Sequence, residues 1–218
     1  MCAIIGTKDF TTLLGMIDLN SYRGSHSHSI SFYNIETGNL ELLKRDFGMP
    51  DLYGWIIPEN TYCVAHIQAP TTNEKTIESI HPAVGGNTKN FIPDHALWHN
   101  GILKEDTIKE FSSKYKTTWD TKQILNIIID EWNDIKSFDH LDGTFSCVYY
   151  RKETGCLYTF RNEISPLFID DNMNISSTKF EGSRETEPNQ IWQLNLKDNT
   201  MTSIGTFTTV ENPYFFGD

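Results

Sequence analysis

The residue best placed for chemistry is Cys2, which follows Met1 in the stretch MCAIIG. If Met1 is removed, one residue carries a thiol with a reference pKa of about 8.5 and an α-amine with a reference pKa of about 7.7 to 8.0. The amine can then take the proton from its own thiol, which would make Cys2 a nucleophile. A cysteine in an apolar strand is also an ordinary small hydrophobic residue, so Cys2 alone leaves both interpretations open.

A second candidate is the stretch ALWHNGI, where Asn100 and Gly101 follow a histidine. Attack of a thiol on an amide creates an oxyanion, which needs hydrogen-bond donors already in position. The side-chain amide of Asn100 and the backbone N–H of Gly101 offer two such donors, and a glycine lets the backbone approach a substrate closely. An Asn-Gly pair is also a common hairpin turn, and that alternative stays open at this point.

Several segments, taken in chain order, resemble the class II glutamine amidotransferase domain, an N-terminal nucleophile hydrolase. They are MCAIIG, YRGSHSHSI, AHIQAPTT, IHP, ALWHNGI, WDTKQIL, LDGTFSCVYY and FRNEISPLFI. The corresponding family patterns are MCGI, RGxDSxG, HTRxAT, a His-Pro pair, HNG, a helix-capping Asp, LxGxFA and RDxxxxxPL. The resemblance covers about residues 1–180 and is sharpest at HNG. It implies that Cys2, freed by removal of Met1, attacks the side-chain amide of glutamine, forms a thioester and releases ammonia for an acceptor.

The same resemblance implies roles for four further residues. Asp120 matches the aspartate that pairs with the α-ammonium group of the substrate, although it also stands where a helix N-cap is expected. Thr71 and His81 match positions that line the glutamine pocket, and Arg23 matches an arginine close to the amine of the nucleophile. A structural role is the alternative for each of these three.

One departure from the family pattern concerns the substrate carboxylate. The family places an arginine where this chain has Gln68. Glutamine carries no charge, so the bidentate pairing of a guanidinium with a carboxylate cannot form. The loss costs about 1.5 to 3 kcal/mol, or roughly tenfold to a hundredfold in affinity. Either another cation compensates, or free glutamine binds weakly, or the substrate has no free carboxylate there.

Three function hypotheses follow. The first is a glutaminase-type amidotransferase domain. Its ammonia would pass to a separate synthase subunit, because the chain contains neither of the glycine-rich phosphate-binding motifs SGGxDS and GxxxxGK[ST]. The second is a related N-terminal cysteine hydrolase that acts on a γ-glutamyl compound or another amide. The third is a degenerate domain kept as a non-catalytic binding subunit. No cofactor and no metal are expected, because the histidine pairs His26/His28 and His95/His99 lack a clear third ligand.

Composition limits the partners and the location. The formal net charge of -11 disfavours nucleic acid and anionic membranes as partners. No apolar run approaches the roughly 18 to 20 residues of a membrane span, and no signal peptide is recognisable, so we expect a cytoplasmic protein. Cys63, Cys147 and Cys156 lie in apolar segments, where we expect buried reduced thiols.

The hydrophobic pattern predicts the elements that must position these residues. Helices are expected at about 10–22, 104–115 and 121–135, and strands at about 1–7, 27–35, 40–47, 61–68, 96–99, 144–151, 156–160, 167–169, 191–196 and 201–204. Residues 70–94 read as a long loop, or as a hairpin with a broad tip, and 72–86 as a candidate lid or an ordinary surface loop. Strands on both sides of central helices predict one α+β domain over 1–218. The resemblance implies a four-layer αββα sandwich of the N-terminal nucleophile hydrolase type.

Overall fold

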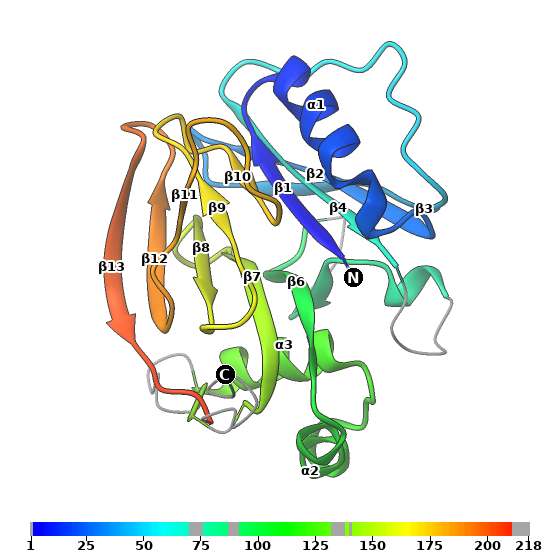
Figure 1. The fold of residues 1–218 in the computed structure, drawn as a ribbon, viewed down its shortest axis with the longest axis vertical. Coiled ribbons are helices and arrows are strands. Elements are labelled where there is room, and N and C mark those ends of the chain that lie inside the picture. Colours follow the sequence, from blue (N-terminus) through cyan, green and yellow to red (C-terminus); the bar gives the residue numbers. More distant parts are fainter. Residues whose placement is uncertain (1, 70–75, 87–91, 132–137, 140, 211–218) are drawn as a thin grey trace, which may run out of the picture.

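Two antiparallel sheets and three α-helices make up the fold in the part of the chain that the computed structural model describes, which is all residues except 1, 70–75, 87–91, 132–137, 140 and 211–218 (Figure 1). In chain order the elements are β1 (Ala3–Thr7), α1 (Phe10–Asn20), η1 (Ser21–Arg23), β2 (Ser27–Asn34), β3 (Leu40–Phe47), β4 (Thr61–Gln68), η2 (Ile77–Ser79), β5 (Ala83–Gly85), β6 (His95–Leu103), α2 (Glu105–Tyr115), α3 (Asp120–Glu131), β7 (Gly143–Arg151), β8 (Cys156–Arg161), β9 (Phe168–Ile169), β10 (Ile175–Ser176), β11 (Arg184–Glu185), β12 (Gln190–Asn195) and β13 (Thr200–Thr206).

The layers follow from three apolar clusters. Between the sheets, Ile4 and Val64 pack with Trp98 from the opposite sheet. On the outer face of the seven-stranded sheet, ordered β11-β9-β10-β1-β4-β2-β3, the helix α1 buries Leu13 and its neighbours. On the outer face of the six-stranded sheet, ordered β13-β12-β8-β7-β6-β5, α3 buries Ile124 and its neighbours. The predicted four-layer αββα sandwich is therefore confirmed.

Local sequence explains how the first helix forms and where it begins. The side chain of Asp9 accepts the backbone N–H of Thr12 at 2.7 Å, which caps the first turn of α1. Leu13, Met16 and Ile17 recur at helical spacing and form the buried stripe. The helix therefore covers β1 and β4 on the outside of the sheet, as Figure 1 shows.

Strand register places the site residues on one face. Ile4 pairs with His66, and Ala3 pairs with Ile67. Because side chains alternate along a strand and Ile4 belongs to the inter-sheet cluster, Cys2 also points between the sheets. Gln68, two residues after His66, points the same way. The beginning of β1 and the end of β4 thus bring Cys2 and Gln68 together.

Some predicted elements differ from the observed ones. Part of the predicted loop 70–94 is the strand Ala83–Gly85, which pairs with β6, so the hairpin alternative holds there. Residues 72–75 of the candidate lid lie outside the described residues. The helix predicted over 121–135 is described as Asp120–Glu131, with Asp120 as its first residue rather than its N-cap. The short strands β10 and β11 were not predicted, because two-residue strands carry no periodic pattern.

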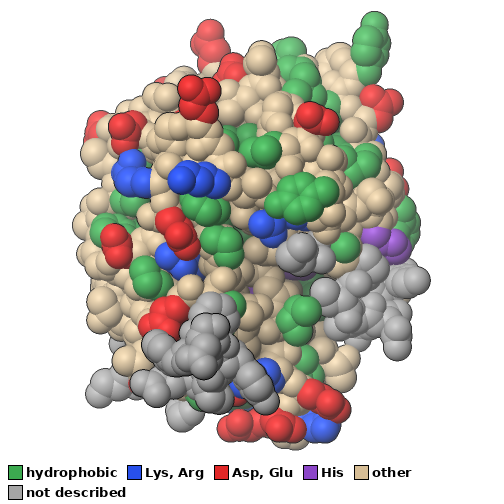
Figure 2. Space-filling view, in the orientation of Figure 1, with side chains coloured by type: hydrophobic (Ala, Val, Ile, Leu, Met, Phe, Trp, Pro, Cys, Tyr) green, Lys and Arg blue, Asp and Glu red, His purple; other side chains and the backbone are tan. Residues whose placement is uncertain are grey.

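Acidic and basic side chains occur together on the face of the molecule drawn in Figure 2. The acidic side chains are scattered over this face, with Lys and Arg side chains among them. No helix among the described residues is long and apolar enough to cross a membrane.

Candidate active site

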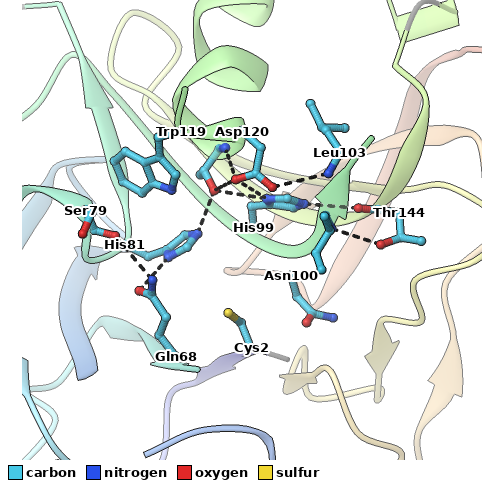
Figure 3. A network of polar contacts seen from close by, with 12 residues as sticks. Cys2, Gln68, Ser79, His81, His99, Asn100, Leu103, Trp119, Asp120 and Thr144 are labelled. Atoms are coloured by element: carbon cyan, nitrogen blue, oxygen red, sulfur yellow. Dashed lines mark hydrogen bonds and ion pairs between the residues drawn. The ribbon is translucent and has the colours of Figure 1, made fainter. Parts of the chain in front are cut away.

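Cys2 lies directly before β1 and is buried, with 7% of its surface exposed. Its Sγ donates to the carbonyl oxygen of Ala69 at 3.6 Å, a long contact. In Figure 3 the thiol lies between the side chains of Gln68 and Asn100. Burial raises the pKa of the thiol to about 11, and the positive charge of the chain's N-terminus, the hydrogen bond to Ala69 and, least, the charge of Arg23 oppose that shift only in part. The thiol is therefore protonated near neutral pH, so it needs a base before it can react.

Asn100 and Gly101 lie inside the strand β6 and form no hairpin turn, so the turn interpretation is wrong. Asn100 pairs with Ser146 and Gly101 with Phe145 of β7. Gly101 has a φ of 153°, and a Cβ built on it would lie 1.9 Å from the carbonyl oxygen of Thr144. Only glycine fits this position.

The side chain of Asn100 is held by hydrogen bonds. Its Nδ2 donates to the Oγ of Ser165 at 3.3 Å and, more weakly, to the Oγ of Ser146 at 3.5 Å. The hydroxyl of Ser165 in turn donates to the backbone oxygen of Asn100 at 2.9 Å. With only 5% of Asn100 exposed, its amide is fixed in one orientation.

A cavity of about 220 Å³ adjoins the Asn100–Gly101 pair. Its lining combines one cation with apolar and small polar side chains: Arg23, Asn100, Gly101, Ile102, Thr144, Ile164, Ser165 and Pro166. Arg23 is fixed at its rim because its Nε donates to Thr178 Oγ1 at 2.8 Å and its Nη2 donates to the oxygen of Ser177 at 3.0 Å. The cavity therefore offers room beside the two predicted oxyanion donors.

A hydrogen-bonded chain runs from Gln68 to the start of α3 (Figure 3). The Oε1 of Gln68 accepts from His81 Nδ1 at 3.1 Å. The Nε2 of His81 lies 3.0 Å from the hydroxyl of Thr121, and Nδ1 of His99 lies 3.1 Å from the same hydroxyl. Thr121 thus joins two imidazoles, and His81 anchors the side chain of Gln68.

Three buried imidazoles gather behind this chain. The rings of His66 and His81 stack with centroids 3.9 Å apart, and Nε2 of His66 lies 3.1 Å from the backbone oxygen of His99. Burial lowers the pKa of His66 to about 3 and holds the pKa of His81 well below its usual range. Burial also lowers the pKa of His99, although the carboxylate of Asp120 opposes that change. The cluster is therefore neutral near neutral pH.

Asp120 is a buried acid, 5% exposed, at the start of α3. Its Oδ1 accepts the backbone N–H of Thr121 at 2.7 Å, and its Oδ2 accepts the N–H of Leu103 at 3.4 Å. Its Oδ1 also lies 4.0 Å from Nδ1 of His99. Its negative charge raises the pKa of the Cys2 thiol, so the two groups lie within electrostatic reach of each other.

Most of the residues predicted from the sequence converge here. Cys2, Gln68, His81, Asn100 and Asp120 lie in one neighbourhood, as Figure 3 shows. Arg23 and Gly101 line the adjoining cavity. Thr71 lies outside the described residues.

Three participants were not assigned to the site from the sequence: His66 and Thr121, which were not singled out, and His99, which was weighed only as half of a metal pair. Their signal was present, because two histidines inside apolar strands are unusual and Thr121 follows the predicted aspartate. No group of three or more His, Cys, Asp or Glu side chains among the described residues could hold a metal ion.

The remaining cysteines are free. Cys63 and Cys147 are buried as predicted, while Cys156 is only half-buried, because its strand end leaves part of the side chain open. Cys147 is the strand partner of His99 and therefore lies beside this site, whereas Cys156 lies at the start of β8.

Comparison with known proteins finds similarity in structure but not in sequence. No family model and no curated protein matches the chain. The allosteric regulatory enzyme of purine biosynthesis, a glutamine PRPP amidotransferase, aligns over 93% of this chain with a TM-score of 0.66 and 16% identity. The chain spans about half of that structure, 48% of its length. A glutamine aminotransferase class-II domain protein from Silicibacter pomeroyi aligns over 96% of this chain and 99% of its own, with a TM-score of 0.49 and 9% identity.

Proposed function

We propose that this chain, which has the fold of a class II glutamine amidotransferase, hydrolyses the side-chain amide of glutamine or of a closely related compound, with Cys2 as nucleophile. The observation that carries the proposal is the meeting of Cys2, from the start of β1, with the fixed amide of Asn100 in β6 (Figure 3). A nucleophile and preset donors on separate, rigid strands are what acyl transfer needs.

The first step is attack of the Cys2 sulfur on the amide carbon. Removal of Met1 frees the α-amine of Cys2, which takes the thiol proton as the carbon–sulfur bond forms. Because burial raises the pKa of the thiol, a free thiolate is scarce and proton transfer accompanies the attack. The protonated amine then returns the proton to the leaving nitrogen, and ammonia departs from a thioester that water hydrolyses.

The oxyanion of the intermediate is stabilised by the backbone N–H of Gly101 and by Asn100 Nδ2, whose contact with Ser146 at 3.5 Å is long enough to leave that N–H for the substrate. The Ser165 hydroxyl supports Asn100 by donating to its backbone oxygen at 2.9 Å. The close approach of the Thr144 carbonyl oxygen excludes a side chain at position 101, so no Cβ covers the backbone N–H of Gly101. Donors that need no reorganisation during the reaction give the largest stabilisation.

On the substrate side, Asp120 receives the α-ammonium group, and Gln68 and His81 lie next to it, joined to it through Thr121. Arg23 stands near Cys2 and the cavity. Thr71 is included in the pocket on the family resemblance alone. No cofactor takes part in these steps.

Ammonia from this site would serve an acceptor on a separate synthase subunit. The solved structure that aligns over 93% of this chain is about twice as long as the aligned part, which leaves room in that protein for a second domain. We propose that a partner protein in the cytoplasm supplies the ammonia acceptor for this chain.

The test is ammonia release from glutamine and from other γ-carboxamides, measured with wild type, Cys2→Ala and Cys156→Ala. The half-buried thiol of Cys156 is the matched control because it lies at the start of β8, outside the site. We expect activity in wild type and in Cys156→Ala and none in Cys2→Ala. Full activity in Cys2→Ala would remove Cys2 from the mechanism, and an inactive wild type on every amide would favour the non-catalytic hypothesis.

A further inference from the structure

The turn that follows β8 is held by the side chain of one buried residue, Asn162, which is 2% exposed. Its Oδ1 accepts the backbone N–H groups of Ile164 and Ser165, both at 3.3 Å. The same oxygen accepts the N–H of Phe145 in β7 at 3.2 Å, and its Nδ2 donates to the backbone oxygen of Gly143 at 2.7 Å. One amide therefore joins this turn to the beginning of β7.

The side chain of Asn162 also extends the ladder between β7 and β8. The last residue pair of that ladder is Ser146 with Arg161. At the next position the N–H of Asn162 donates to the oxygen of Phe145 at 3.0 Å, while the N–H of Phe145 donates to the Asn162 side chain. Phe145 therefore uses both of its backbone groups toward β8.

This orientation decides where the N–H of Gly101 points. Gly101 in β6 is the strand partner of Phe145. Because Phe145 turns its backbone groups toward β8, the pair exchanges no hydrogen bonds, and the N–H of Gly101 points away from β7. The N–H of the next residue, Ile102, points toward β7 and donates to Thr144 Oγ1 at 3.0 Å. The pairing of β6 with β7 therefore leaves the N–H of Gly101 for an oxyanion.

The same turn fixes the second donor, the side chain of Asn100. Ser165, whose N–H is held by Asn162, is 6% exposed. Its hydroxyl donates to the backbone oxygen of Asn100 at 2.9 Å and accepts from Asn100 Nδ2 at 3.3 Å. One amide hydrogen of Asn100 is thereby held toward Ser165, which sets the direction of the other hydrogen.

We propose that Asn162 is a positioning residue for oxyanion stabilisation, acting on Gly101 through Phe145 and on Asn100 through Ser165. Asn162 is not among the residues that line the cavity beside the two donors, so it acts without touching the substrate. This inference rests on the proposed function, because it assigns a role in stabilising the intermediate of that reaction. It predicts a loss in kcat with little change in KM, since the oxyanion forms only after the substrate has bound.

The test measures kcat and KM for ammonia release by wild type, Asn162→Ala and Ser165→Ala, with the γ-carboxamide that the wild type hydrolyses fastest. We expect each variant to lower kcat by roughly tenfold to a hundredfold, because a misplaced donor costs less than a deleted one.

The matched control is Asn174→Ala, which also removes an asparagine that holds a turn with both atoms of its amide. The Oδ1 of Asn174 accepts from Thr7 Oγ1 at 2.7 Å, and its Nδ2 donates to Asp170 Oδ2 at 2.8 Å. Thr7 ends β1, whereas Cys2 precedes it, so this turn lies away from the site. Asn174→Ala should therefore keep the wild-type kcat.

A double mutant separates positioning from a general loss of stability. In Asn100→Ala the donor that Ser165 positions is gone, so adding Ser165→Ala should have little further effect on kcat. Losses that multiply in Asn100→Ala/Ser165→Ala would contradict the path through Ser165. If Asn162→Ala fails to fold, this double mutant still decides the question.

The outcomes distinguish the inference from the proposed function. An unchanged kcat in a folded Asn162→Ala, with Asn100→Ala impaired, would overturn the inference and leave the proposed function standing. A wild type that hydrolyses no amide would overturn both.

Discussion

Acid should destabilise the fold through His66 and His81, because neither can be protonated without leaving its buried place. Both side chains are at most 3% exposed and stack on each other. Burial lowers the pKa of His66 to about 3 and that of His81 well below its usual range. The unfolded chain binds a proton at each histidine below a pKa of about 6.5, so it gains protons before the native state does. Stability is therefore present above pH about 6.5 and is lost as the pH falls.

The magnitude follows from these two sites. Between about pH 7 and about pH 5, His66 costs about 1.4 kcal/mol for each pH unit below 6.5, or about 2 kcal/mol. His81 lowers the free energy of unfolding further in the same direction. The loss at His66 alone is a sizeable share of the roughly 5 to 15 kcal/mol that stabilises a typical domain.

The assay is urea unfolding of wild type and His66→Asn at both pH values. The variant should lose about 2 kcal/mol less than wild type between the two, since one of the two sites no longer titrates. His26→Asn, outside the cluster, is the control and should keep the wild-type pH dependence. The same pH dependence in His66→Asn and in wild type would refute the placement of a neutral His66 in the core.

Three further predictions concern β6 and the chemistry. Gly101→Ala should lower the free energy of unfolding by roughly 2 kcal/mol or more, because the new Cβ would meet the carbonyl oxygen of Thr144 and the residue has a positive φ. The control is Gly15→Ala in α1, which has no atom within 4 Å of the new Cβ and should raise the free energy of unfolding by about 0.5 to 1 kcal/mol. Urea titration measures both changes. Asn100→Ala should lower kcat for ammonia release by on the order of 100- to 1000-fold with the fold retained by circular dichroism; an unchanged kcat would remove it from oxyanion stabilisation. The rate of ammonia release should rise with pH through about 7.7 to 8.0 as the α-amine of Cys2 loses its proton; a rate that follows only the thiol would exclude the amine as base.

The layered fold was predictable because its signals are local and repeated. The alternating strands, the apolar stripe of α3 and the breaks between them predicted an α+β domain, and the family resemblance implied the αββα sandwich. The two-residue strands β10 and β11 were not predictable, because only their neighbours in the sheet define them. The Asn-Gly pair left a turn open for the same reason, since only its pairing with β7 shows that Gly101 lies in a strand.

The site was predictable residue by residue but not as a network. Cys2, Asn100 and Asp120 followed from the family resemblance. The contact of His81 with both Gln68 and Thr121 depends on how the edge of one sheet meets the other sheet and a helix. Such contacts join residues far apart in the chain, so no spacing in the sequence predicts them. The neutrality of the histidines likewise comes from burial, which only the packed structure defines.

The most direct test of the central claim is mass spectrometry of the N-terminal peptide after the reaction with L-glutamine or another γ-carboxamide is quenched with acid. We expect a peptide that begins at Cys2 and carries the acyl group of the substrate as a thioester. Cys2→Ala should show no acyl group on any peptide. A peptide that retains Met1 and carries no acyl group, while ammonia is still released, would contradict the assignment of Cys2 as the nucleophile.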